Sequence, residues 1–229
     1  YYVSLYVEEA GIVNDKPYSK PIGLDLGVKT FATIHNGDTH MEIKNINKIN
    51  SNIIKAEEKI VGLQKAISNK VEINKKGKEE ATVYSSNNIK KLWDKVRKYK
   101  AQLARIRMDF IKKVCSSLVK AKPEYITIED LAVLQMLAKS SSKLADAIQK
   151  SLFGYFDVFL RWKCRQYGVE LRIANRYFAS SKKCSSCGNI KKDLTLFDRT
   201  YVCSECGLEI GRDINAALNL LYLKKYTLA

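Results

Sequence analysis

The stretch PIGLDLGVKTFATIHNG, residues 21–37, decides the fold class of this chain. Its residues alternate in polarity around a tight bend, as is typical of two adjacent strands. Leu24 therefore lies on one face of the first strand and Asp25 on the other, together with Gly23 and Gly27. We expect the glycines to leave room beside the Asp25 carboxylate for a metal ion and a phosphate chain. The alternative is a polar residue on the wet face of an edge strand, and this stretch alone does not decide between the two.

Strand patterns also flank this stretch. Residues 1–7 have strand composition, and residues 11–20 form a turn-rich link. Asn36 and Gly37 form a strong hairpin turn signal, which predicts a third strand over residues 38–43.

A helical pattern follows the strands. Apolar residues recur every three or four positions over residues 46–67 and again over residues 92–118, which predicts two helices. The polar stretch 69–88 between them predicts an exposed loop. We therefore expect an antiparallel helical hairpin over residues 44–120.

The chain is strongly basic. Its 229 residues include 40 Lys and Arg against 24 Asp and Glu, a formal net charge of +16. Such an excess opposes a compact fold through self-repulsion unless a polyanion neutralises it, and we favour nucleic acid over a charge that merely maintains solubility. The first ten residues carry Glu8 and Glu9 instead of a basic start, and no apolar run approaches a membrane span. We expect a soluble, cytoplasmic protein with no membrane partner.

Basic residues also line the second expected helix, on the face opposite its apolar positions. Such a face is ordinarily solvated, but with this net charge we favour a nucleic-acid groove that includes Lys98 and Arg105. The full set is Lys95, Arg97, Lys98, Lys100, Arg105, Arg107, Lys112 and Lys113.

The second half of the chain continues with shorter elements. Residues 124–129 form an expected strand that ends at Glu129, and residues 131–142, with a serine run at their end, form an expected mobile link. Residues 144–167 form an expected helix, followed by Gly168 and a strand over residues 169–174. The helix carries aromatic residues that we assign to the core, namely Phe153, Phe156, Phe159 and Trp162.

Two CxxC pairs lie near the end of the chain, separated by fifteen residues. This spacing predicts a four-thiolate structural zinc site, a zinc ribbon, because each pair brings two sulfurs to one ion. A redox dithiol would need one pair near a βαβ unit and would leave the other pair unexplained. The expected ligands are Cys184, Cys187, Cys203 and Cys206, and the other cysteines, Cys115 and Cys164, are expected to be plain buried residues. Basic residues around the ribbon suggest that it also touches nucleic acid: Lys182, Lys183, Lys191, Lys192 and Arg199.

Three acids stand out from the remaining charges: Asp25 within a strand, Glu129 at a strand end and Asp213 at the start of the last helix. Asp213 taken alone is better explained as a helix cap. The order of the expected elements matches the ribonuclease-H-like fold, where the first and fourth strands are neighbours and the last helix packs near both. We therefore predict an α/β fold with a mixed sheet in which the three carboxylates converge.

Converging carboxylates predict a metal site. Two Asp and one Glu cannot all stay ionised in a small space unless cations neutralise them, and their hard oxygen ligands select Mg²⁺ or Mn²⁺. Two such ions, about 3.5–4 Å apart, are the usual apparatus for phosphodiester cleavage.

Five segments together resemble the TnpB family, transposon-encoded RNA-guided nucleases related to the compact type V CRISPR effectors. They are GLDLGVKTFA, IEDL, SSKKCSSCG, CSECGLEI and RDINAALN, within residues 21–222. The resemblance implies a RuvC-type nuclease domain with Asp25, Glu129 and Asp213 as metal-binding catalytic carboxylates. It also implies a zinc ribbon that acts as a target-nucleic-acid-binding module, and an Arg212 that touches the scissile backbone. Gly211 departs from the family, which commonly has another acid at that position.

The resemblance also implies domains and partners. The expected divisions are residues 1–20, a strand and linker left from an N-terminal wedge domain; 21–175, the RuvC-like nuclease domain with its helical-hairpin insertion; 176–211, the zinc ribbon; and 212–229, the helix that completes the nuclease domain. The expected function is a metal-dependent DNA endonuclease, RNA-guided in its full-length form, with guide RNA as partner. A nuclease-inactive RNA-guided DNA-binding protein is the alternative. A RuvC-like junction resolvase or transposase explains the acids but not the position of the ribbon.

Overall fold

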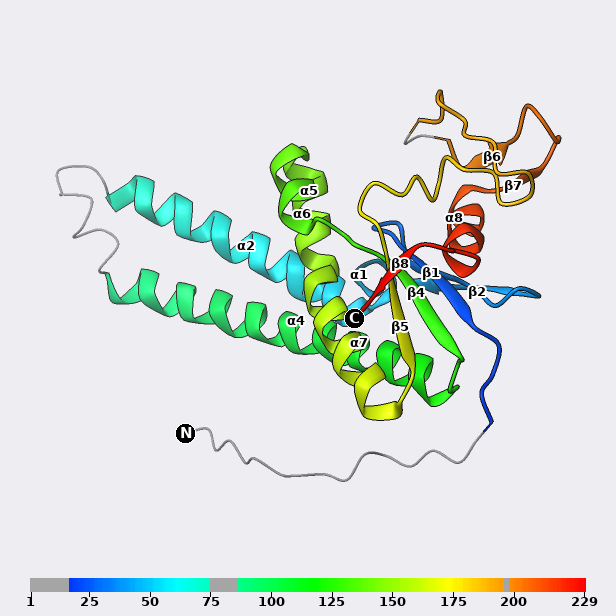
Figure 1. The fold of residues 1–229 in the computed structure, drawn as a ribbon. Coiled ribbons are helices and arrows are strands. Elements are labelled where there is room, and N and C mark those ends of the chain that lie inside the picture. The colour runs from blue at the N-terminus through cyan, green and yellow to red at the C-terminus, as the bar shows by residue number, and fades with distance from the viewer. Residues whose placement is uncertain (1–16, 75–85, 196–197) are drawn as a thin grey trace. The chain divides into compact units, whose positions relative to one another are not determined.

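The computed structural model describes residues 17–74, 86–195 and 198–229 (Figure 1). The chain divides into two compact units: Ile46–Phe110 form one, and the residues before and after them form the other. The strand expected over residues 1–7 and the middle of the loop expected over residues 69–88 lie outside the described residues.

A six-stranded mixed sheet is the centre of the larger unit, in the order β3-β2-β1-β4-β5-β8. Its strands are β1 (Ile22–Leu26), β2 (Thr30–His35), β3 (His40–Lys44), β4 (Tyr125–Glu129), β5 (Glu170–Ala174) and β8 (Tyr226–Leu228). β1 pairs antiparallel with β2 but parallel with β4, and β4 pairs parallel with β5. This order and these directions confirm the predicted ribonuclease-H-like fold class, with the first and fourth strands as neighbours.

The two faces of the sheet carry different side chains. Leu24, Ile126 and Ile128 point to one face and are at most 1% exposed. The pairing of β1 with β4 places Asp25 and Glu129 on the other face. The last helix, α8 (Arg212–Leu221), lies on that second face against β1, β2 and β4.

The turn between β2 and β3 is longer than the sequence predicted. Asn36 Oδ1 accepts hydrogen bonds from the backbone N–H groups of Asp38 and Thr39, at 3.1 and 2.9 Å. Gly37 takes a positive φ of 96°, which suits glycine. The turn therefore includes Asp38 and Thr39, and the third strand begins only at His40.

The link expected to be mobile over residues 131–142 is helical, so that prediction was wrong. It contains α5 (Val133–Lys139), and Ser141 caps α6 (Ser142–Ser151) by accepting a hydrogen bond from Leu144 N–H. A short helix followed by serines resembles a loop in composition, but here a serine serves as the helix cap.

The single helix expected over residues 144–167 is two helices, α6 and α7 (Phe153–Tyr167), which meet at Leu152. Leu152 adopts a left-handed conformation with φ of 52°. Nothing in the sequence predicts this break, because leucine rarely takes that conformation. Gly168 ends α7 in the left-handed conformation, as expected.

The aromatic residues of α7 divide between core and surface. Phe153 and Phe156 are buried as predicted and pack against Phe31 of β2, with ring centroids 6.1 and 5.6 Å apart. Trp162 is half-exposed and packs against Phe159 on the surface, so its assignment to the core was wrong.

The smaller unit is a helical hairpin. It contains α1 (Ile46–Ile49), α2 (Ser51–Asn74) and the first part of α4 (Asn87–Lys120). Its core is formed by Ile53, Ala56, Ile60, Ile67, Val71, Ile89, Val96 and Leu103. Both helices extend into the range 69–88 that was predicted to be a loop. None of the helices in the described part of the chain combines the length and the apolar composition of a membrane span.

Candidate metal centres

Helix α8 lies directly on strand β1, and Gly23 permits this contact. A Cβ atom at Gly23 would lie 2.1 Å from the backbone oxygen of Ala217 and 2.4 Å from the backbone nitrogen of Leu221. A Cβ at Gly27 would lie 2.8 Å from the backbone oxygen of Thr30, in the bend between β1 and β2. The two glycines therefore make room for a helix and a bend, and the expectation that they clear space for a phosphate was wrong.

The same packing brings Asp213 towards Asp25. Asp213 lies one helical turn before Ala217, about 6 Å along the axis of α8. Asp25 lies two residues after Gly23, about 7 Å along β1. The charge of Asp213 raises the pKa of Asp25, so the two acids belong to one neighbourhood.

The electrostatics of Asp25 show that the charges of Glu129 and Asp213 both act on it. Burial raises the pKa of Asp25 well above its usual range, and the charges of Glu129 and Asp213 raise it further, against the opposing charge of Arg212. Burial also raises the pKa of Glu129, against a hydrogen bond from Ser180 and the charge of Arg212. Ionised carboxylates in such a place are unfavourable until a cation neutralises them.

The three carboxylates lie near one another, but their oxygen atoms are not gathered as closely as the ligand atoms of one metal ion. Among the described residues, the four ribbon cysteines form a group of possible metal ligands whose ligand atoms all lie within 4.8 Å of one another, and the three acids do not form such a group. Carboxylate oxygens, such as those of the three acids, are ligands that suit Mg²⁺ or Mn²⁺.

Asp213 is not the cap of its helix. Gly211 occupies the N-cap position of α8 and makes no side-chain capping hydrogen bond, and Asp213 lies inside the first turn. The capping explanation that the sequence favoured for this acid alone is therefore wrong, although the helix dipole still favours a negative charge there.

Arg212 lies between the acids and the ribbon. Its Nη1 donates to the backbone oxygens of Thr195 and Asp198, at 3.1 and 3.5 Å. Its Nε is buried and has no hydrogen-bond partner in the part of the chain that the structure describes. The guanidinium thus adds positive charge beside the carboxylates and keeps one donor unused.

A hydrogen-bonded bracket, which we define as Ser180, Asn215 and Asn219, joins the acids to the ribbon. Ser180 Oγ donates to Glu129 Oε1, and the backbone oxygen of Ser180 accepts from Asn219 Nδ2 at 2.8 Å. Asn215 Nδ2 donates to the backbone oxygen of Lys183 at 2.7 Å, and Asn219 Nδ2 does so at 2.6 Å.

The bracket was missed by the sequence reasoning. Its members are at most 7% exposed, which is unusual for polar side chains unless they are hydrogen-bonded. One feature of the sequence could have indicated the bracket. Asn215 and Asn219 lie four residues apart, on the face of α8 that also carries alanine and leucine.

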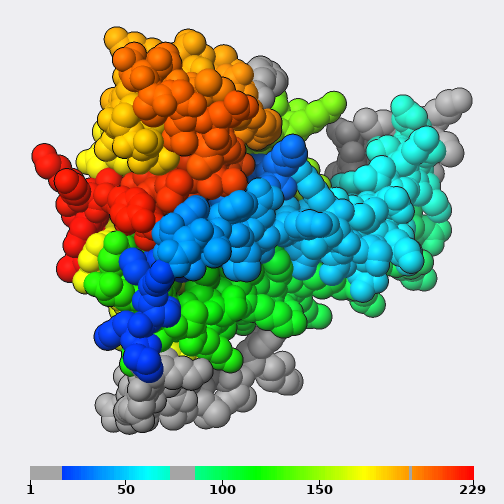
Figure 2. Space-filling model, turned by 90° about the vertical axis from the view of Figure 1, so that its right-hand side faces the viewer, coloured from blue at the N-terminus to red at the C-terminus, as the bar shows by residue number. Residues whose placement is uncertain are grey.

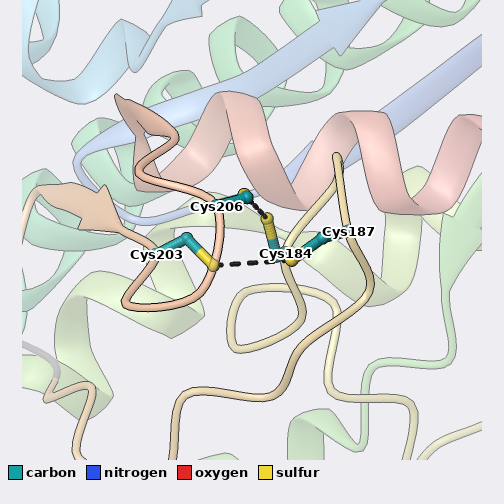
Figure 3. A group of neighbouring side chains, drawn as sticks. All are labelled: Cys184, Cys187, Cys203 and Cys206. Carbon is teal, nitrogen blue, oxygen red and sulfur yellow. Dashed lines mark hydrogen bonds between the residues drawn. The ribbon is translucent and has the colours of Figure 1, made fainter.

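The four ribbon cysteines gather as predicted (Figure 3). The Sγ atoms of Cys184 and Cys206 are 3.6 Å apart, and so are those of Cys187 and Cys203. These separations exclude a disulfide of about 2.05 Å. They match a tetrahedral zinc ion, since Zn–S bonds of about 2.3 Å place the sulfurs roughly 3.8 Å apart.

The surrounding ribbon holds the cysteines in place. Strands β6 (Thr200–Val202) and β7 (Glu209–Gly211) pair antiparallel, and the fully buried Tyr201 packs in a small core with Cys184 and Cys203. The backbone N–H groups of Cys206 and Glu205 lower the pKa of the Cys203 thiol to about 6, which favours the thiolate that metals bind. Cys115 and Cys164 are buried in helices, as expected.

The basic residues expected to bind nucleic acid lie on two different parts of the chain. Lys182 and Lys183 are partly exposed beside the first cysteine pair, and Lys98 and Arg105 are exposed on the helical hairpin. Arg107 differs from its neighbours, because it pairs with Glu57 and donates to Asn47 at 2.7 Å inside the hairpin. The predicted basic face therefore lacks Arg107.

Two family models match the chain. The model OrfB_IS605, described as a probable transposase, matches residues 4–140, more than half of the chain. The model of the Cas12f1-like TNB domain matches residues 153–220, which include all four ribbon cysteines.

Individual proteins are also similar. A "Putative RNA-guided DNA endonuclease" of Streptomyces pristinaespiralis is 30% identical over 96% of this chain and 49% of its own length. A TnpB-like protein of Acanthamoeba polyphaga mimivirus is 30% identical over 87% of this chain and 36% of its own length. The solved Cas12f1–sgRNA–target DNA complex contains a chain with the same fold, with a TM-score of 0.59 and 17% identity over 93% of this chain and 52% of that one.

The chain thus spans less than half of the length of the Streptomyces and mimivirus relatives. The resemblance of five sequence segments to the TnpB family agrees with both family models and with the TnpB-like relatives. The chain belongs to the OrfB_IS605 family of probable transposases, the TnpB family.

Proposed function

We propose that this chain carries the nuclease site of an RNA-guided DNA endonuclease that hydrolyses phosphodiester bonds. Asp25, Glu129 and Asp213 are the catalytic carboxylates of this proposal and hold Mg²⁺ or Mn²⁺. The four ribbon cysteines hold a structural Zn²⁺. The observation that carries the proposal is the raised pKa of Asp25, whose causes after burial are the charges of Glu129 and Asp213. A buried acid whose ionisation is disfavoured by two neighbouring acids has a reason to be in a basic protein if cations bind there.

Each residue then has a part. Asp25, Glu129 and Asp213 would hold two divalent ions, which would supply an activated water and stabilisation of the leaving 3′ oxygen. The charges of both other acids act on Asp25, so we assign Asp25 as the central ligand of the set. Ser180 orients the Glu129 carboxylate by its hydrogen bond. Arg212 sets positive charge beside the carboxylates, and we assign that charge to the substrate phosphate.

Nucleic-acid partners are part of the proposal. The basic residues Lys98, Arg105, Lys182 and Lys183 bind phosphates of DNA or guide RNA, which agrees with the net charge of +16. The relatives named as RNA-guided endonucleases and the fold shared with Cas12f1 support a guide RNA and a DNA target. Guide pairing would select the sequence, while the protein contacts the backbone and cuts. The domains follow the same proposal: residues 21–175 with 212–229 form the nuclease domain, and 176–211 the target-binding ribbon.

Cleavage of a matched DNA target by the full-length protein with its guide RNA tests this function. We expect cutting with Mg²⁺ and none when Mg²⁺ is left out. Asp25→Asn should slow cutting by at least about a hundredfold, because loss of a metal ligand removes several kcal/mol of transition-state stabilisation. Glu42→Gln is the matched control, since Glu42 is an exposed acid on the same sheet.

Two results would contradict the proposal in different ways. Cutting at an unchanged rate by the Asp25→Asn protein would reject the assigned site. A guided wild-type protein that binds its target but never cuts it would instead favour the nuclease-inactive DNA-binding alternative.

A further inference from the structure

A short segment joins β5 to the zinc ribbon and passes the end of β4. We call residues 175–180 the connector. It begins beside Glu129, because Glu129 pairs with Ala174, the last residue of β5. In Figure 1 the chain runs from β5 towards the ribbon, and Figure 2 shows the ribbon, in orange, directly above the C-terminal residues in red.

The connector is folded into a compact turn by its own hydrogen bonds. Asn175 Oδ1 accepts from Tyr177 N–H at 2.9 Å, and the Asn175 backbone oxygen accepts from Phe178 N–H at 2.8 Å. The backbone oxygen of Phe178 then accepts from Ser180 N–H at 2.9 Å. Because these bonds link the two ends of the connector, a displacement of Arg176 would also displace Ser180.

Two side chains attach the connector to the end of β4. Arg176 Nε and Nη2 lie 3.0 and 2.8 Å from Asp130 Oδ2. Ser180 Oγ donates to Glu129 Oε1. Consecutive residues at the end of β4, Glu129 and Asp130, therefore hold the two ends of the connector.

The ion pair of Arg176 and Asp130 contributes more to position than to stability. Their side chains are 44% and 38% exposed, and ion pairs at such exposure add little to the free energy of unfolding. A guanidinium with two nitrogens on one carboxylate oxygen nevertheless fixes the direction of its side chain, which an ammonium does not.

We propose that Arg176 is a positioning residue of the carboxylate site: it holds the connector against Asp130, so that Ser180 keeps its hydrogen bond to Glu129. A carboxylate that is already oriented by such a bond binds a cation more tightly. The effect on metal binding rests on the proposed function, whereas the position of the connector does not.

Hydrogen exchange tests the position of the connector. The protein is the zinc-loaded full chain without Mg²⁺ or Mn²⁺, and nuclear magnetic resonance gives the exchange rates of the Phe178 and Ser180 amides. Arg176→Gln should speed this exchange by about two- to fivefold, as for the loss of one half-exposed ion pair. Lys150→Gln is the matched control and should leave these rates unchanged, because Lys150 pairs with Asp146 of its own helix, at 2.7 Å.

Two exchange results would overturn the positioning role. One is a wild-type exchange rate for the Ser180 amide in Arg176→Gln. The other is an equal increase in exchange at amides throughout the sheet, which would indicate a general loss of stability instead of a displaced connector.

Mn²⁺ binding, followed by electron paramagnetic resonance, tests the effect on the metal site. Arg176→Gln should weaken Mn²⁺ binding by about two- to fivefold and leave the zinc content unchanged. The removal of a positive charge would by itself strengthen the binding of a cation, so a weakening separates position from charge.

A double variant tests whether Arg176 acts through Ser180. Arg176→Gln/Ser180→Ala should bind Mn²⁺ no more weakly than Ser180→Ala alone, because the bond that Arg176 supports is then already absent. Losses of affinity that add in the double variant would overturn the proposal.

Failure of the positioning role and failure of the proposed function give different results. A wild-type chain that binds no Mn²⁺ would contradict the proposed function, while the exchange rates, measured without divalent metal, still decide whether Arg176 positions Ser180. Wild-type Mn²⁺ affinity in Arg176→Gln would overturn the positioning role and leave the proposed function intact.

Discussion

Asp25 illustrates how a single residue can oppose the stability of the fold that holds it. Its pKa lies well above the usual range, first because of burial and then because of Glu129 and Asp213. The folded chain therefore keeps a proton on Asp25 at pH values where the unfolded chain has lost it. The contribution of Asp25 to stability is fully present below its unfolded pKa of about 3.9 and is lost as pH rises through the folded pKa. A bound cation restores it by neutralising the ionised form.

The Asp25→Asn variant should therefore be more thermally stable than wild type at neutral pH when no divalent ion is present. The difference should shrink as pH falls towards 4, since wild-type Asp25 is then protonated in the folded chain and increasingly protonated in the unfolded chain. Added Mg²⁺ should raise the melting temperature of wild type more than that of the variant. Calorimetric melting between pH 4 and 8 measures this, and a variant that is less stable than wild type at pH 7 would contradict it.

The ribbon cysteines give a second prediction at this scale. The purified chain should contain one zinc ion, and Cys203→Ser should lose it, because zinc needs all four thiolates of a structural site. Cys115→Ala is the matched control, as Cys115 is a buried cysteine outside the ribbon. Elemental analysis by mass spectrometry gives the count, and a Cys203→Ser protein with a full complement of zinc would count against the site.

Contacts between elements set the positions of the acids. Gly23 lets α8 lie against β1, and this closeness brings Asp213 to the strand that carries Asp25. The bracket of Ser180, Asn215 and Asn219 then ties α8 and Glu129 to the first cysteine pair. Glu129 and the ribbon are thus joined by one set of hydrogen bonds.

Gly23→Ala should destabilise the fold, because its new Cβ would meet the backbone of α8, which cannot yield as a side chain can. We expect a loss of about 1–3 kcal/mol in the free energy of unfolding. Gly154→Ala is the matched control: Gly154 lies in α7 with nothing within 4 Å of the added Cβ, and alanine there should add up to about 1 kcal/mol. Urea titration measures both, and equal stabilities of the two variants would show that α8 is not held against β1.

Ser180→Ala should weaken Mn²⁺ binding by about 10- to 100-fold, the usual effect of removing a group that orients a metal ligand. Ser151→Ala is the control, since its buried hydroxyl bonds only to its own helix, at Ala147. Titration followed by electron paramagnetic resonance gives the affinity, and the zinc content should stay unchanged. Mn²⁺ binding by Ser180→Ala at wild-type affinity would remove Ser180 from the metal site.

For the whole molecule, the sequence predicted that the first and fourth strands are neighbours, and it predicted the helical hairpin and the cysteine cluster. These depend on periodicity and on the spacing of ligands, which local sequence records. The sequence analysis assigned residues 212–229 to one helix, which was wrong, because α8 ends at Leu221 and the edge strand β8 follows over Tyr226–Leu228. It did not predict the left-handed break at Leu152 or the helix α5, because the local residues favour other structure. It also did not predict the close packing at Gly23, because that depends on contact between distant segments. The bracket is of the same kind, since the partners of Asn219 lie 36 and 39 residues away in the sequence. The three acids were found from fold order, and their roles are still proposals.

Anomalous diffraction from crystals grown with Mn²⁺ would show whether Asp25, Glu129 and Asp213 hold divalent metal. We expect manganese peaks bounded by these three carboxylates, their loss in Asp25→Asn, and a separate zinc peak among the four cysteines in both proteins. A map with the zinc peak present and no manganese between the three carboxylates would contradict this expectation.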